Sequence, residues 1–146
     1  MTTPAISTTE LYTHIDTLLN TDTPLFIHGS PGIGKSYIVA DVANKNNLEL
    51  VDVRLSQMDP VDLRGVPSIK DNQTVWMPPV FFPKDMDSEG ILFLDELNAA
   101  PPSVQAAIYQ LVLNRQMGEY MLPKGWRIIC AGNRISDRGV VFRMPT

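Results

Sequence analysis

Hydrophobic positions along the chain form two alternating patterns, short apolar runs and helical stripes. The short runs predict strands, because each is too brief for a helix and is bounded by polar or turn residues: 25–28, 48–55, 91–95 and 126–133. Apolar residues three or four positions apart predict longer helices: about 7–19, 34 to about 44, and 101–116. Strands alternating with helices are typical of a parallel sheet with right-handed crossovers. We therefore expect one α/β domain over residues 1–146.

Three remaining segments have weaker patterns. Residues 66–79 predict a hairpin, with the polar letters "KDNQ" at its tip and Ile69, Val75 and Trp76 on its arms. Residues 117–125 indicate a second hairpin or loop, and 58–65 a turn or short helix. Residues 134–146 show no clear period.

Composition excludes several classes of protein. A chain of 146 residues with 44% hydrophobic and 19% charged residues is typical of a globular domain rather than a disordered one. Its net charge of −4 argues against a dedicated nucleic-acid binder. No apolar stretch approaches the roughly 20 residues of a transmembrane helix, and the N-terminus does not resemble a secretory signal. The single cysteine, Cys130, excludes an intrachain disulfide, so we expect a cytoplasmic protein.

Residues 29–36 match the pattern G-x-x-x-x-G-K-[ST] between a predicted strand and a predicted helix. The glycines allow backbone N–H groups to turn toward phosphate oxygens, and the helix adds its positive N-terminal end. Lys35 can reach the β- and γ-phosphates, and the Ser36 hydroxyl can ligate Mg²⁺. The alternative is a chance glycine-rich turn, which the strand-to-helix context disfavours. The expected nucleotide-binding residues are Gly29, Ser30, Pro31, Gly32, Ile33, Gly34, Lys35, Ser36 and Tyr37.

Two adjacent acids, Asp95 and Glu96, end the third predicted strand. Side chains alternate along a strand, so the two carboxylates are expected to point in different directions. In a phosphate-binding fold, Asp95 would hold Mg²⁺ and Glu96 would orient and deprotonate the attacking water. The alternative is a polar strand end or a helix cap, where acids are common.

Asn133 ends the fourth predicted strand. Ligands of open α/β sheets gather at the carboxyl ends of the strands, so Asn133 is a candidate to hold water or touch the γ-phosphate. Its alternative is a turn asparagine. His28 ends the first strand, and without an evident partner its structural interpretation is favoured.

These motifs together resemble those of AAA+ ATPases. "GSPGIGKS" is similar to the Walker A loop, "ILFLDE" to Walker B and "AGN" to the sensor-1 strand of that family. "DELNAAPPSVQ" is similar to the D-E-I-N-R-A-P-P-x-V-Q run of the MoxR-like group, as is "DLRGVP" to another of its segments.

The resemblance implies a P-loop NTPase fold, a three-layer α/β sandwich with hairpin inserts. It implies that ATP and Mg²⁺ bind, with Lys35 and Ser36 on phosphate and metal and Asp95 supporting the metal. Glu96 would activate water and Asn133 would serve as the sensor. It further implies a homo-oligomeric ring, expected to be a hexamer, that remodels or assembles a protein client. A von Willebrand factor A domain protein is the partner it implies, and the hairpins of such ATPases often face the pore or the client.

The sequence departs from the MoxR-like pattern in two respects. Ala99 stands where that group usually has arginine. The segments that carry the arginine finger, a fifth strand and a helical lid are not recognised, so we expect a fragment of a longer protein that hydrolyses ATP poorly alone. None of the terminal arginines is assigned as the finger: Arg134, Arg138 and Arg143.

Other functions remain open on the residues alone. A GTPase should carry an N-K-x-D motif, and the "NK" at Asn44 is followed by no aspartate. A nucleotide kinase should carry an arginine-rich lid, which the sequence does not show. A non-hydrolysing nucleotide-binding or assembly module and a DNA-related AAA+ motor share the same core motifs.

Overall fold

Four parallel strands form the central sheet of the computed structural model, which describes residues 8–21, 23–28 and 34–132. The strand order is β1-β8-β5-β2, with bounds Leu25–His28, Gly125–Gly132, Glu89–Asp95 and Glu49–Arg54 respectively. All four coincide with strands predicted from the short apolar runs. The parallel α/β fold class is therefore confirmed.

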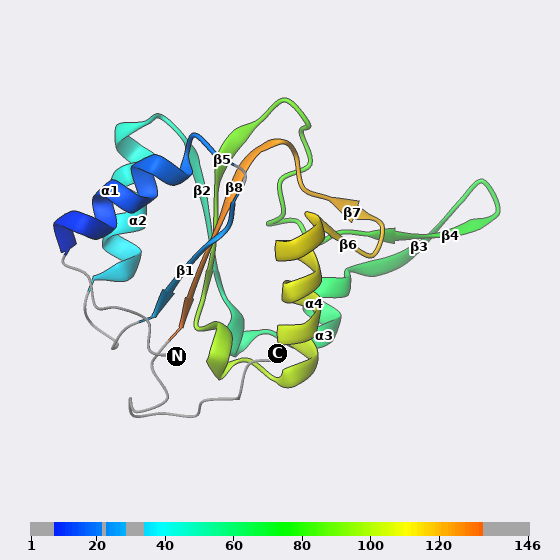
Figure 1. The fold of residues 1–146 in the computed structure, drawn as a ribbon. Helices are drawn as coiled ribbons and strands as arrows, with labels where there is room; N and C mark the ends of the chain where they lie inside the picture. The colour runs from blue at the N-terminus through cyan, green and yellow to red at the C-terminus, as the bar shows by residue number, and fades with distance from the viewer. Residues whose placement is uncertain (1–7, 22, 29–33, 133–146) are drawn as a thin grey trace.

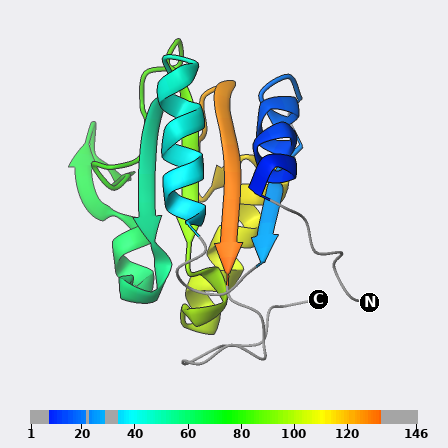
Figure 2. The same ribbon diagram turned by 90° about the vertical axis from the view of Figure 1, so that its left-hand side faces the viewer.

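Helices cover both faces of the sheet, which makes three layers (Figure 1). α1 (Thr8–Leu18) and α2 (Lys35–Lys45) pack on one face. α4 (Pro102–Asn114) and the short α3 (Pro60–Arg64) lie on the other. Figure 2, turned by a quarter, shows α1 and α2 in front of the strands.

Side-chain alternation along the central strands explains why both faces are buried. On β5, Ile91 and Phe93 pack with α1 and α2, whereas Leu92 and Leu94 pack with α4. All four are fully buried. A strand covered on both faces must be apolar at every position, which is why this segment reads as a continuous run rather than an alternating one.

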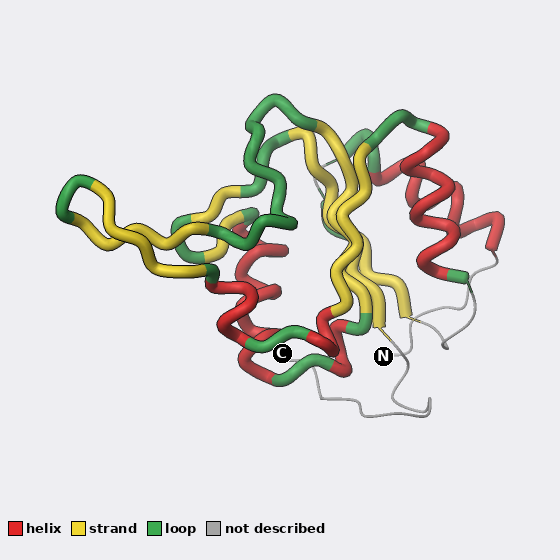
Figure 3. The backbone as a smooth tube through the Cα atoms, turned by 180° about the vertical axis from the view of Figure 1, so that it is seen from behind, coloured by secondary structure: helices red, strands yellow, loops and turns green. Residues whose placement is uncertain are grey.

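Two hairpins extend from the α3/α4 side, where the sequence predicts a hairpin at 66–79 and a hairpin or loop at 117–125 (Figure 3). β3 (Val66–Lys70) pairs with β4 (Gln73–Met77), and β6 (Gln116–Met117) pairs with β7 (Tyr120–Met121), each antiparallel. The tip residues Asp71 and Asn72 both have positive φ, 52° and 60°. Two positive-φ residues form the tight turn whose twist matches paired strands.

Two short 3₁₀ turns follow the neighbouring strands β2 and β5 at their carboxyl ends. η1 (Leu55–Gln57) follows β2, and η2 (Leu97–Ala99) follows β5. The two turns lie against one another. They position the polar residues that come directly after the sheet.

Among the described helices, none has both the length and the apolar character needed to cross a membrane.

Candidate active site

The carboxyl ends of three parallel strands meet at one edge of the sheet, the lower edge in Figure 1. His28 at the end of β1 is paired in register with Gly132 at the end of β8, and β5 ends at Asp95 beside them. α2 begins at the same edge, at Lys35. Its preceding residue, Gly34, has φ 81°, a left-handed conformation that glycine adopts without strain.

Lys35 is buried at this edge, with 7% of its surface exposed. Its ammonium donates a hydrogen bond to the carbonyl oxygen of Gly132, at 3.3 Å. A buried ammonium must be hydrogen-bonded, because removal from water strongly disfavours an unpaired charge. The contact therefore holds the lysine at the end of β8, next to the start of α2.

Ser36, the next residue, contacts Asp95 at the end of the neighbouring strand β5. Its hydroxyl donates to Asp95 Oδ2 at 3.3 Å. Ligand oxygens at adjacent positions of one Mg²⁺ ion lie about 3 Å apart, so this pair fits a shared magnesium ion. Hydroxyl and carboxylate oxygens are also the donors that this hard cation prefers.

Glu96 leaves the strand in a left-handed conformation, with φ 58°. Its backbone N–H donates to Asp95 Oδ1 at 2.8 Å. The Ser56 hydroxyl of η1 donates to Glu96 Oε2. The Asp95 carboxylate therefore contacts Ser36, and the Glu96 carboxylate contacts Ser56. The two side chains point in different directions. A non-glycine residue at positive φ is strained backbone of the kind that gathers at functional sites.

Burial and nearby charges shift two pKa values at this edge. Burial lowers the pKa of His28 from its usual 6.5, and the Lys35 ammonium lowers it further. Burial raises the pKa of Asp52 on β2, and the Asp95 carboxylate raises it further, while Arg54 opposes the shift. Both residues are nonetheless exposed, so these pKa shifts reflect partial desolvation together with the charges that face one another at this end of the sheet.

The structure brings together four of the predicted site residues: Lys35, Ser36, Asp95 and Glu96. Gly34 lies at the start of α2, and Tyr37 on α2 is 71% exposed. Asn133 and the loop residues Gly29, Ser30, Pro31, Gly32 and Ile33 lie outside the described residues. The roles assigned to all these residues remain predictions.

Three polar residues near the acids were not singled out from the sequence. Ser56 contacts Glu96, and Asn98 is buried beside Gly132. Gln105 is fully buried and donates from Nε2 to the Ala100 carbonyl at 2.9 Å, which joins η2 to α4. Asn98 and Gln105 belong to the "DELNAAPPSVQ" run. Their place in this motif was the signal that could have identified them. Ser56 carried no such signal.

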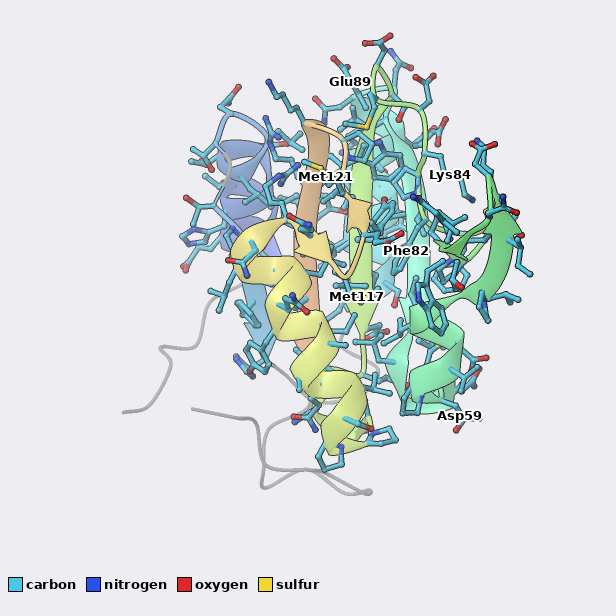
Figure 4. The ribbon with its side chains drawn as sticks, turned by 90° about the vertical axis from the view of Figure 1, so that its right-hand side faces the viewer. Asp59, Phe82, Lys84, Glu89, Met117 and Met121 are labelled. Carbon is cyan, nitrogen blue, oxygen red and sulfur yellow. The ribbon has the colours of Figure 1, made fainter. Side chains whose placement is uncertain are left out.

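A cavity of about 550 Å³ lies on the opposite side of α4 from this edge, between α3, α4 and the two hairpins. Trp76, Met117 and Tyr120 line it, with two prolines, Pro60 and Pro78. Figure 4 looks onto this face, with Met117 and Met121 on the short hairpin beside α4 and Asp59 at the start of α3. The cavity is mostly apolar, unlike the polar edge that holds Lys35 and Asp95.

The fold and the edge together define an AAA+ nucleotide-binding domain. Residues 24–143 match the family described as AAA domain (dynein-related subfamily), and the chain belongs to this family. The AAA+ resemblance seen in the sequence is therefore confirmed.

Similar proteins support the same fold. Midasin from Giardia intestinalis is 33% identical over 94 residues, which are 64% of this chain and 2% of midasin. A candidate ATPase from Cytophaga hutchinsonii aligns with a TM-score of 0.63 at 19% identity, over 93% of this chain and 42% of that protein. NtrX from Brucella abortus in complex with ADP aligns with a TM-score of 0.58 at 19% identity, over 92% of this chain and 31% of NtrX. The chain thus spans less than half the length of each of these relatives.

Proposed function

We propose that this chain binds ATP with Mg²⁺ at the carboxyl edge of its sheet and hydrolyses it. The observation that carries the proposal is the hydrogen bond between Ser36 and Asp95, with Lys35 and Glu96 at the same edge. The Ser36 hydroxyl, at the start of α2, and the Asp95 carboxylate, at the end of β5, would both be ligands of one magnesium ion. Lys35 is buried next to them. Membership of the AAA+ family and the ADP complex of the similar NtrX support nucleotide as the ligand.

Each residue then has a distinct chemical role. Lys35 neutralises charge on the β- and γ-phosphates, and Ser36 and Asp95 hold the metal. Magnesium, when bound, neutralises the charge that develops on the phosphate oxygens. Glu96 accepts a proton from the attacking water while the oxygen of that water bonds to the γ-phosphorus. The bond between the γ-phosphorus and the oxygen that bridges it to the β-phosphate breaks at the same time. The products are ADP and inorganic phosphate. Asn133, the residue that follows Gly132 in the sequence, orients the water.

We further propose a MoxR-like role, in which hydrolysis within a homo-oligomeric ring, a hexamer, remodels or assembles a protein client in the cytoplasm. The exposed β3–β4 hairpin supports a client contact, because Val66, Ile69 and Met77 are 66%, 82% and 54% exposed. Apolar side chains that gather on a projecting element mark a protein contact more often than single surface residues do. A client with a von Willebrand factor A domain is the partner that the MoxR-like resemblance favours.

Glu96→Gln tests the proposal directly. Glutamine keeps the shape of the side chain but cannot accept the proton, so turnover should fall by about 10²–10⁴-fold while ATP binding persists. Binding is measured with a fluorescent ATP analogue, and turnover by phosphate release from the complete protein with Mg²⁺. GTP competition distinguishes an ATPase from a GTPase.

Glu89→Gln is the matched control, because Glu89 begins the same strand at the opposite edge of the sheet and is exposed. It should leave binding and turnover unchanged. Failure of the wild-type protein to bind ATP would refute the proposed site. Full turnover in Glu96→Gln would refute the role of Glu96 alone.

A further inference from the structure

The Asn98 carboxamide is a buried polar group in the turn that follows the two acids. Asn98 is only 5% exposed and lies in η2, which begins directly after Glu96. Its side chain lies over Gly132, the last residue of β8. A Cβ atom added to Gly132 would lie 2.7 Å from Asn98 Oδ1 and 3.0 Å from Asn98 Cγ. A Cβ atom at 132 would therefore displace the Asn98 carboxamide, and the constraint comes from this contact and not from a positive φ.

Gly132 also contacts the lysine of the proposed phosphate site. Its carbonyl oxygen accepts the hydrogen bond from Lys35 Nζ at 3.3 Å. A single residue therefore touches both groups, the Asn98 carboxamide on its Cα side and the Lys35 ammonium at its carbonyl. Any shift of Gly132 changes where that ammonium is held.

We propose that Asn98 is a positioning residue that fixes the end of β8 and, through the Gly132 carbonyl, the location of the Lys35 ammonium. The inference rests on the proposed ATP site. The physical basis is preorganisation, because a charged group held in place before the ligand arrives loses less freedom when the ligand binds. Asn98 also places the turn that follows Glu96 against Gly132, the residue that accepts the hydrogen bond from Lys35.

Asparagine suits this position for two reasons. Its flat carboxamide can lie against a glycine Cα where a branched apolar side chain would not fit. As a buried group with donors and an acceptor, it must be hydrogen-bonded and so is held in one orientation. Alanine at 98 would leave space above Gly132 and remove this restraint.

A double-mutant cycle with Lys35 separates positioning from a purely structural role. Asn98→Ala should weaken binding of a fluorescent ATP analogue by roughly threefold to tenfold in the wild-type background. In the Lys35→Met background, with the analogue raised to concentrations at which the weakened binding is measured, the same change should have little further effect, because the group that Asn98 positions is gone. Equal losses in both backgrounds would overturn the proposal. Asn114→Ala, on the exposed end of α4, is the control and should leave binding unchanged.

A second pair of variants tests the contact itself without nucleotide. Gly132→Ala should lower the thermal midpoint, because its new Cβ displaces the Asn98 carboxamide. Asn98→Ala combined with Gly132→Ala should recover part of that loss, because the methyl group then enters the vacated space. Additive losses in the double variant would show that the two residues are not packed together and would overturn the proposal.

The ATP site and the positioning role of Asn98 fail on different results. Loss of ATP binding by the wild-type protein refutes the ATP site. Wild-type binding that Asn98→Ala leaves unchanged refutes the positioning role while the ATP site stands.

Discussion

His28 reports on charge at the sheet edge because its imidazole senses Lys35. Burial lowers its pKa below 6.5 and the Lys35 ammonium lowers it further, so the folded protein binds this proton at a lower pH than the unfolded chain. The contribution of His28 to stability therefore decreases as pH falls through about 6.5. An NMR titration should give a His28 pKa below 6.5.

Lys35→Met should raise the His28 pKa by removing the charge. The pKa should still remain below 6.5, because burial is the larger cause. A His28 pKa at or above 6.5 in the wild-type protein would contradict the partial desolvation of this imidazole. An unchanged pKa in the variant would contradict its proximity to Lys35.

The reactivity of the Cys130 thiol tests the burial of β8. It is fully buried in β8, and burial raises its pKa to about 12. The thiol should therefore be protonated and inaccessible at pH 8, where the thiolate is the reactive form. A thiol reagent such as DTNB should not react with the native protein at this pH but should react with one thiol per chain in denaturant. Rapid native reaction would show that β8 is not covered as described.

The sequence predicted the residues of the edge better than their contacts. The pattern at 29–36 and the acids Asp95 and Glu96 are local signals, and the structure brings Lys35, Ser36 and both acids together. The hydrogen bond between Ser56 and Glu96 could not be predicted from a local sequence pattern. It joins residues 40 positions apart and depends on how β2 and β5 pair and on where their 3₁₀ turns lie.

At the scale of elements, Gly65 controls how the β3–β4 hairpin joins α3. It has φ 83° and ψ −163°, a combination essentially restricted to glycine. An added Cβ would lie 1.9 Å from the Met77 carbonyl oxygen, which belongs to the backbone and cannot rotate away. Gly65→Ala should therefore displace the base of the hairpin and lower the free energy of unfolding.

Gly118→Ala is the matched control for this change. Gly118 also has positive φ, at 60°, but an added Cβ there would meet nothing within 4 Å. It should cost about 1–2 kcal/mol from backbone strain alone, whereas Gly65→Ala should cost about 1–3 kcal/mol more because of the clash. Urea unfolding of the two variants measures the difference. Equal losses would contradict the close approach of Gly65 to Met77.

Element boundaries show where sequence reasoning falls short. The helix expected over 101–116 ends at Asn114, because Arg115 adopts φ 56°. The Arg115 guanidinium donates to the carbonyls of Pro123 and Trp126, at 2.9 and 2.7 Å. No glycine or proline occupies this C-cap position, and the hydrogen bonds of Arg115 join residues 8 and 11 positions further along the chain. The turn or short helix expected at 58–65 is the helix α3, with Asp59 and Asp62 forming a capping box.

At the scale of the whole molecule, the two faces of the sheet serve different parts of the proposed function. The packing of α1 and α2 fixes the start of α2, where Lys35 and Ser36 lie. The opposite face carries α4, the hairpins and the apolar cavity that Trp76 and Tyr120 line. α4 connects them in the chain, because it follows the Glu96 turn and leads into the β6–β7 hairpin.

Nucleotide binding should be visible as stabilisation of the whole chain. A ligand at 100 times its Kd stabilises the native state by about 2.7 kcal/mol, which for a domain near this size raises the thermal midpoint by about 5–10 °C. Mg·ATP should produce such a shift in the wild-type protein and in Glu96→Gln, because glutamine removes a proton acceptor and not a phosphate contact. Lys35→Met should show little shift at the same concentration, since it lacks the ammonium that faces the phosphates. Differential scanning fluorimetry with and without Mg·ATP measures all three, and Glu89→Gln serves again as the control. A shift in Lys35→Met as large as in the wild-type protein would place the nucleotide somewhere other than the carboxyl edge of the sheet.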